Sequence, residues 1–104
     1  MSNNIFQQAK QAFEMRSQLK KIQKAMENEQ GEYTNAGVTV VANGNASLVS
    51  VSIDPSAAEP ANLKRLERTI TENANKALNL AKEKGAKLMQ DKSKEMGLDK
   101  FFGG

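Results

Sequence analysis

One segment, Gly37–Pro55, constrains the fold of this chain more than any other. Apolar residues alternate with other residues on both sides of an Asn43-Gly44 pair, which is the strongest short signal for a hairpin turn. The alternating residues are Val38, Val40, Val49, Val51 and Ile53. The pattern predicts a β-hairpin with these side chains on one face and with Gly44 supplying a positive φ in the turn. The segment holds no Lys or Arg, although the chain has a net charge of +3.

Two loop lengths are compatible with this turn. A two-residue loop pairs Val38 with Val49, whereas a four-residue loop, Asn43–Ala46, pairs Val38 with Val51. The longer loop also pairs Val40 with Val49, so that valine meets valine twice, and we favour it for that reason. The strand is expected to end at Asp54, because the following proline cannot donate to the ladder, and Asp54 is interpreted as a turn or capping residue rather than a catalytic acid.

The residues before the hairpin predict a long helix over about Asn3–Asn28. This segment has no Gly or Pro, and its apolar residues recur at heptad spacing. The seam consists of Ala12, Met15, Leu19, Ile22 and Met26, with Ile5 one heptad earlier and an adjacent apolar strip of Phe6, Ala9 and Phe13. The segment Gly31–Gly37 that follows is expected to form a short edge strand or an extended turn.

A second long helix is expected from about Pro60 to Lys84, with Met96 as an alternative end. Its apolar stripe is large at first and small from Ala74 to Gly85, which permits another element to approach closely. The stripe consists of Leu63, Leu66, Ile70, Ala74, Ala77, Ala81, Gly85 and Leu88. Gly85 leaves open a break into two helices, and residues 97–104 are expected to be a flexible tail.

The composition narrows the class of protein. A chain of 104 residues is expected to form a single domain, residues 1–104. It has no Cys and no His, which excludes disulfides, thiolate metal sites and Ser–His or Cys–His nucleophile pairs. No catalytic residue, metal site or cofactor is therefore expected. No apolar run approaches the ~20 residues of a membrane span, and a signal-peptide pattern is lacking, so a soluble cytoplasmic protein is expected.

The lengths of the predicted elements favour a homodimer. A helix of 25 residues is about 38 Å long, whereas a three-stranded sheet is only about 14 Å wide. The apolar stripes therefore overhang the sheet and need a partner, for which a C2 homodimer is the simplest solution. We expect Met15, Leu19 and Ile22, together with the alternating residues of the hairpin, to pack in the core or in this dimer.

These elements resemble the YbaB/EbfC family of bacterial nucleoid-associated proteins. The shared patterns are Val38-x-Val40-x-x-Asn43-Gly44, then Ile53-Asp54-Pro55, with Lys10-Gln11-Ala12-x-x-Met15 and Ile22-Gln23 in the first helix. The resemblance covers roughly residues 5–96. It implies an α+β homodimer whose sheets join at the core, whose helices project as arms, and which binds double-stranded DNA through helical residues. It brings no catalytic residue.

The candidate DNA contacts are basic residues of the two helices. They are Lys10, Arg16, Lys20, Lys21, Lys24, Lys82, Lys84 and Lys87. Because no sequence-reading motif is present, they predict contacts to the DNA backbone with low sequence specificity, in a nucleoid protein that affects nucleoid organisation and gene expression. Ordinary solvated helix faces explain the same residues. A protein-interaction module whose arms grip a protein partner is the alternative, and an enzyme is disfavoured by the missing His and Cys.

Overall fold

The computed structural model describes residues 2–96, so the predicted tail at 97–104 lies outside the described residues. The chain forms α1 (Ser2–Glu27), β1 (Gln30–Asn35), β2 (Val38–Asn43), β3 (Leu48–Ile53), the short 3-10 helices η1 (Pro55–Ala58) and η2 (Pro60–Asn62), and α2 (Leu63–Met96). The strands form one antiparallel sheet in the order β1-β2-β3. The predicted α+β arrangement of helix, three-stranded sheet and long helix is confirmed.

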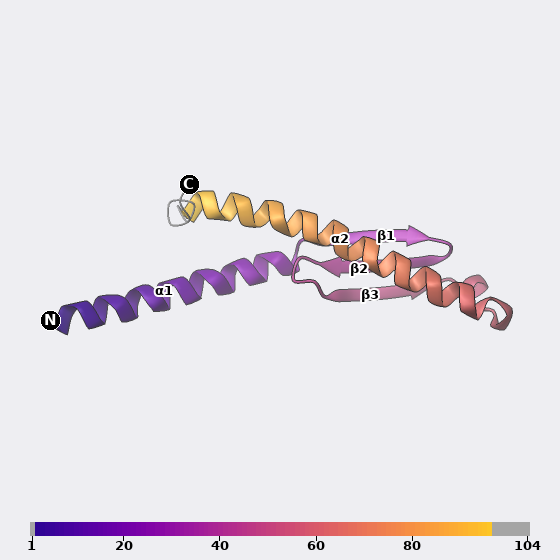
Figure 1. The fold of residues 1–104 in the computed structure, drawn as a ribbon, viewed down its shortest axis with the longest axis horizontal. Coiled ribbons are helices and arrows are strands. Elements are labelled where there is room, and N and C mark those ends of the chain that lie inside the picture. The colour runs from indigo at the N-terminus through magenta and orange to yellow at the C-terminus, as the bar shows by residue number, and fades with distance from the viewer. Residues whose placement is uncertain (1, 97–104) are drawn as a thin grey trace.

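The molecule is elongated. Its principal extents are 73 × 26 × 17 Å and its radius of gyration is 20.1 Å, against about 13 Å for a compact globule of this length. The length comes from α1 and from the C-terminal half of α2, which extend beyond the same end of the sheet (Figure 1). We call these two projecting segments the arms.

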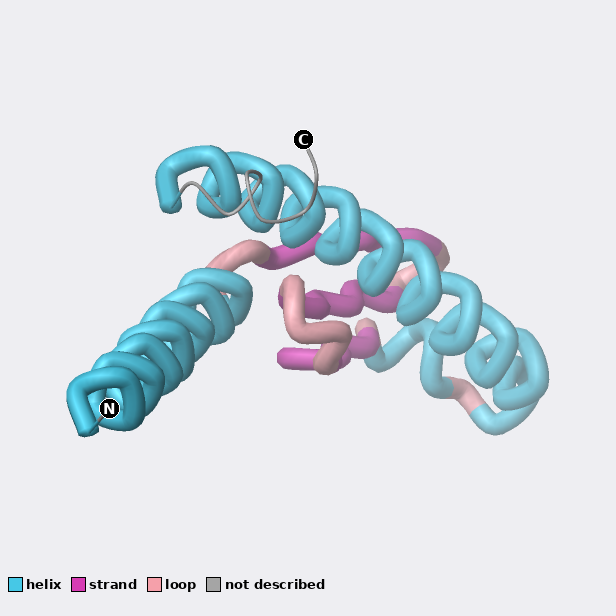
Figure 2. Tube along the Cα trace, turned by 60° about the vertical axis from the view of Figure 1, so that its left-hand side comes forward, coloured by secondary structure: helices cyan, strands magenta, loops and turns pink. Residues whose placement is uncertain are grey.

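Small side chains let α2 lie close against the sheet. α2 crosses β1 and β2 (Figure 2), and the buried core is formed by Val38, Val40 and Ala42 of β2 with Ala77 and Ala81 of α2. The nearest approach is at the glycine of β1. A Cβ on Gly31 would lie 2.5 Å from the carbonyl oxygen of Ala77 and 2.5 Å from the amide nitrogen of Ala81. The predicted close approach along the small-residue stripe is thus confirmed.

The alternative of a helix break at Gly85 is wrong, because α2 continues without interruption to Met96. Gly85 is buried and faces the turn between β2 and β3, where an added Cβ would meet Met26 Cε at 3.0 Å and Gly44 Cα at 3.4 Å. A glycine in mid-helix is explained here by close packing of the end of α1, the turn and α2.

The role predicted for Gly44 is also wrong. The residue with positive φ in this turn is Ala46 (62°), whereas Gly44 is not in the left-handed region. Gly44 instead contacts the end of α1: its amide donates to the Met26 carbonyl oxygen at 3.0 Å, and a Cβ would lie 2.9 Å from the same oxygen. Glycine is needed at position 44 for space.

The favoured hairpin register is wrong by two residues. Val38 pairs with Ile53 and Val40 pairs with Val51, instead of Val51 and Val49 respectively. The last ladder pair is Ala42 with Leu48, so five residues, 43–47, lie between the paired positions instead of four. Within this turn, the Asn43 amide donates to the Ser47 carbonyl oxygen at 2.9 Å. A bulge follows, in which Val41 pairs with Ser50 and Ala42 with Leu48, so that Val49 is left without a direct partner. The predicted common face of Val38, Val40, Val51 and Ile53 survives, since a shift of two preserves parity.

The segment after α1 is a strand, the first of the two readings that the sequence allowed. β1 joins β2 through Ala36 and Gly37, which both have positive φ (52° and 79°), as a two-residue primed turn requires. At the other end of the sheet, the Asp54 carbonyl oxygen accepts from the Ala57 amide, so Asp54 does lie in a turn. Its side chain makes no capping hydrogen bond, so the capping role is wrong.

Two polar residues of α2 that the apolar stripe did not indicate, Thr69 and Asn73, are also buried. Asn73 of α2 is fully buried, and its Nδ2 donates to the carbonyl oxygens of Asn35 (3.0 Å) and Val38 (2.9 Å). These carbonyl groups flank the β1–β2 turn. Asn73 therefore fixes the position of α2 along the sheet, because buried carbonyl groups require donors.

Candidate nucleic-acid interface

The apolar seam of α1 is covered only where the helix meets the sheet. Ile22 is 5% exposed and Met26 is half-buried against Gly44 and Gly85. Further along the arm, Leu19 is 49% and Met15 is 53% exposed. Two expected packing residues of this helix thus lie on the surface of the isolated chain.

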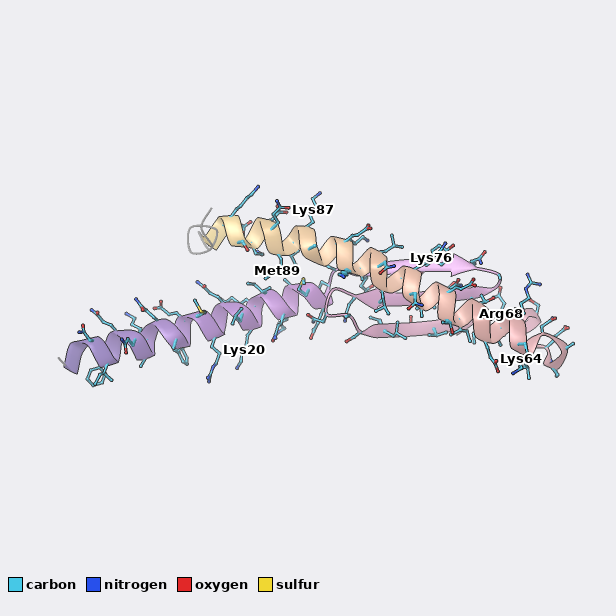
Figure 3. All side chains as sticks on the ribbon, viewed as in Figure 1. Lys20, Lys64, Arg68, Lys76, Lys87 and Met89 are labelled. Carbon is cyan, nitrogen blue, oxygen red and sulfur yellow. The ribbon has the colours of Figure 1, made fainter. Side chains whose placement is uncertain are left out.

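The basic residues of α1 all lie on its exposed surface. They are Lys10, Arg16, Lys20, Lys21 and Lys24. Within residues 2–96 the ion pairs are Lys64–Glu67 and Lys92–Glu95, both in α2, so none of the five cations of α1 is neutralised by an ion pair there. Lys20 points away from α2 (Figure 3). The five side chains are therefore free to meet an anionic partner.

The three candidate lysines of α2 do not form one patch. Lys82, Lys84 and Lys87 are exposed, but Lys84 Nζ donates to the Gln30 carbonyl oxygen at 2.7 Å and so is held against β1. At 100° per residue, Lys82 lies about 160° around the helix from Lys84. Lys87 points outward from α2, away from α1 (Figure 3). The structure thus separates Lys82 from Lys84 and Lys87, which line one shallow pocket together, whereas it gathers five cations on α1.

A further cation of α2 has a structural role that the sequence did not indicate. Lys76 lies over the ring of Tyr33, with Nζ 4.9 Å from the ring centroid and 3.3 Å from the hydroxyl oxygen. This cation–π contact ties α2 to the outer edge of β1.

The third strand presents an uncovered apolar surface. α2 crosses β1 and β2 and leaves β3 open (Figure 2). Four apolar side chains of β3 are exposed: Leu48 (51%), Val49 (49%), Val51 (42%) and Ile53 (39%). β3 is also an edge strand, so one row of its backbone groups is unpaired within the sheet. By contrast, Val38 and Val40 are fully buried.

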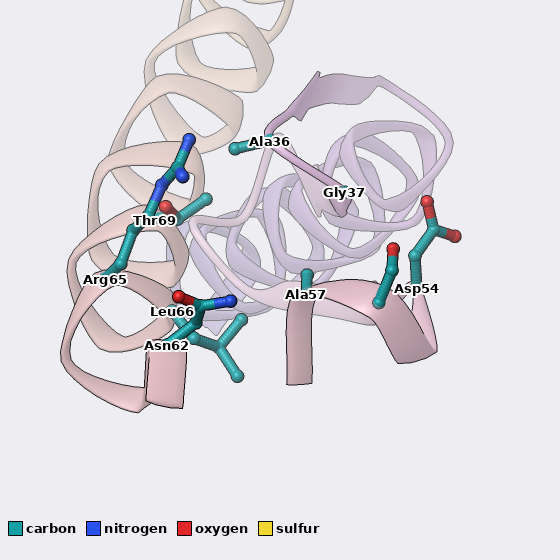
Figure 4. A pocket seen from close by; sticks show the side chains of 9 residues that line it. Ala36, Gly37, Asp54, Ala57, Asn62, Arg65, Leu66 and Thr69 are labelled. Atoms are coloured by element: carbon teal, nitrogen blue, oxygen red, sulfur yellow. The ribbon is translucent and has the colours of Figure 1, made fainter. Parts of the chain in front are cut away.

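A pocket with a volume of about 310 Å³ lies beside the β1–β2 turn. It is lined by Gly37, Asp54 and Ala57 on one side and by Arg65 and Thr69 of α2 on the other (Figure 4). Asp54 and Arg65 stand on opposite sides of it (Figure 4).

In the described part of the chain, no group of three or more acidic side chains is placed to hold a metal ion. Neither helix within residues 2–96 has a stretch long and apolar enough to cross a membrane.

Comparisons with known proteins agree on one family. The YbaB/EbfC DNA-binding family model matches residues 1–96. A nucleoid-associated protein of Clostridium novyi is 34% identical over 84% of this chain and 78% of its own length. A nucleoid-associated protein of Caldanaerobacter subterraneus is 35% identical over 77% of this chain and 74% of its own. An uncharacterized protein of Mycoplasma pneumoniae is 35% identical over 71% and 78%, respectively. No solved structure matches the chain significantly.

Proposed function

Because the chain belongs to the YbaB/EbfC DNA-binding family, we propose that it is a nucleoid-associated protein that binds double-stranded DNA as a homodimer. The observation that carries this proposal is the group of five exposed cations on the projecting helix α1, none of them in an ion pair within the described residues. Such cations neutralise phosphates and release counterions, which drives binding whatever the base sequence. The activity is binding, and no catalytic step or cofactor is proposed.

The arrangement of the arm suits contact with the DNA backbone. α1 has 26 residues and is therefore about 39 Å long, which is comparable to one turn of duplex. Its cations extend from Lys10 to Lys24, so a single arm reaches several phosphates. Lys82 and Lys87 of α2 are placed to add contacts, whereas Lys84 first has to leave its hydrogen bond to Gln30.

The uncovered face of β3 supports the homodimer. Val49, Val51 and Ile53 are between 39% and 49% exposed, beside an open strand edge. A second copy placed on this face by a two-fold axis buries both sets of side chains at once, as an isologous interface does. It also joins two pairs of arms in one molecule.

The exposed seam of α1 also favours the second candidate, a module whose arms grip a protein. Met15 and Leu19 are apolar and accessible, as an interface anchor requires. This candidate would be supported if affinity capture recovers one protein in stoichiometric amount and nuclease treatment does not release it. The five cations of α1, which make no ion pair within the described residues, favour DNA over a protein as the partner.

Neutralising the arm is expected to weaken DNA binding far more than an equal loss of charge elsewhere. The test variant is Lys20→Gln/Lys21→Gln/Lys24→Gln, and the control is Lys64→Gln/Arg65→Gln/Arg68→Gln at the far end of α2 (Figure 3). At 0.1 M salt, we expect the arm variant to lose about 100-fold in affinity for duplex, because each lost phosphate contact removes one counterion-release contribution.

The measurement is the Kd by electrophoretic mobility shift on one duplex at fixed salt. The control variant should bind within about threefold of the wild type, since surface charges distant from the contact act only through the screened field. Equal losses in the two variants would mean that overall charge, and not α1, governs binding.

A further inference from the structure

Two phenylalanines on α1 are left uncovered. Phe6 is 74% and Phe13 is 73% exposed, although phenylalanine is among the residues most often buried. They are one heptad apart and so share one side of the helix. At 100° per residue, Phe13 lies about 180° around α1 from Ile22, the residue that packs at the sheet. The two phenylalanines lie about 80–120° around the helix from the nearby seam residues Ile5 and Ala12. A partner that covers the part of the seam nearer the sheet therefore leaves them exposed.

Cations flank this aromatic line on both sides. Measured around the helix from Phe13, Lys10 and Lys21 lie about 60–80° to one side and Arg16 lies about 60° to the other. Lys20 and Lys24 lie on the same side of the helix as Phe13, within about 20° of it around the helix axis, and nearer to the sheet. All five cations are exposed and none makes an ion pair within residues 2–96. The carboxylates nearest this line are Glu14, about 100° around the helix from Phe13, and Glu27, about 40° from it at the end next to the sheet. The surface around the two phenylalanines therefore carries a net positive charge, with Lys10 on one side and Arg16 on the other.

The major groove of DNA complements such a surface. It is about 12 Å wide and admits an α-helix, and phosphates line both of its edges. Its floor is apolar at thymine, whose C5-methyl group is contacted by apolar side chains, including Phe. A second copy of the chain complements this surface poorly, because its own α1 brings five more cations.

We propose that α1 lies in the major groove, with Phe6 and Phe13 against thymine methyl groups and the flanking cations on the phosphates of both strands. The two rings are about 10.5 Å apart along the helix axis, close to three steps of a strand that rises 3.4 Å per nucleotide. This inference rests on the proposed binding of double-stranded DNA. It adds a preference for thymine to binding that is otherwise governed by phosphates.

The test compares two duplexes of identical A·T-rich sequence, one containing thymine and one containing uracil, which lacks only the C5-methyl group. The proteins are the full-length wild type, Phe6→Ala/Phe13→Ala, and the control Ile5→Ala. Ile5 is 69% exposed on the same helix but lies about 100° around it from Phe6. Alanine preserves the helix in each variant, and circular dichroism and size-exclusion chromatography check the fold and the assembly.

The wild type and Ile5→Ala are expected to bind the thymine duplex about tenfold more tightly than the uracil duplex, as burial of two methyl groups implies. The double variant is expected to bind both duplexes equally. A wild type that binds both duplexes with the same Kd overturns this inference and leaves the proposed function intact. A wild type that binds neither duplex at low salt overturns the proposed function as well.

One further control addresses a lipid surface, which basic amphipathic helices also bind. Vesicles with and without anionic phospholipid are mixed with the same three proteins. We expect no difference between the wild type and the double variant. Vesicle binding that is lost in the double variant, without a thymine preference in the wild type, overturns the inference in favour of a membrane surface.

Discussion

Replacing Gly31 with alanine is expected to destabilise the protein by about 3 kcal/mol, because the added methyl group has no space. Its carbon would lie 2.5 Å from the carbonyl oxygen of Ala77 and from the amide nitrogen of Ala81. Both atoms belong to the backbone of α2, which moves only as a helix and therefore loses its packing on the sheet. The corresponding fall in Tm is about 12–24 °C for a domain of this size, measured by circular dichroism.

Glu32→Ala is the matched control for this prediction. Glu32 follows Gly31 in β1 but is exposed, so its replacement is expected to change the stability by less than about 0.5 kcal/mol. If the Gly31→Ala variant has the same Tm as the wild type, α2 does not approach β1 as closely as the structure places it.

Replacing Val51 with aspartate is expected to separate the proposed homodimer into monomers of 11.4 kDa. Val51 is 42% exposed in the isolated chain, so the monomer tolerates a carboxylate there. An apolar interface between two β3 strands does not, because each copy would have to bury an unpaired charge. Sedimentation velocity measures the mass, and a monomer that keeps the wild-type circular dichroism spectrum supports the interface.

The same variant is expected to bind DNA about 100-fold more weakly, because two linked sets of arms bind with an avidity that one set lacks. Ser50→Asp is the control, since Ser50 is exposed on the opposite face of the same strand. A Val51→Asp variant that stays dimeric would show that Val51 of β3 does not lie in the dimer interface.

The elements of the fold were predictable because they depend on local periodicity. Alternating valines predicted the hairpin, and heptad or small-residue spacing predicted both helices. Details that depend on contacts between elements were not predictable. Gly44 was interpreted as a φ requirement, but it makes space for the end of α1, and the left-handed residue is Ala46. The register of β2 and β3 depends on the length of that turn and on the bulge at Val49. The alternation of apolar residues does not show where a bulge lies.

The candidate site was predictable as a list of cations but not as a surface. All eight basic residues are exposed. Only the structure shows that Lys84 is held by Gln30, since that contact joins residues far apart in the sequence. Asn73 was missed because its partners are backbone carbonyl groups, which leave no pattern in the sequence.

The salt dependence of DNA affinity tests the central claim most directly. The Kd of the wild-type protein is measured from 50 to 300 mM salt on two duplexes of unrelated sequence but equal thymine content. Five cations on α1 predict that log K falls linearly with log[salt], with a slope of about −4.5 or steeper on both duplexes. Affinity that does not change with salt, or binding to only one of the two duplexes, would contradict recognition through the DNA backbone by the arms.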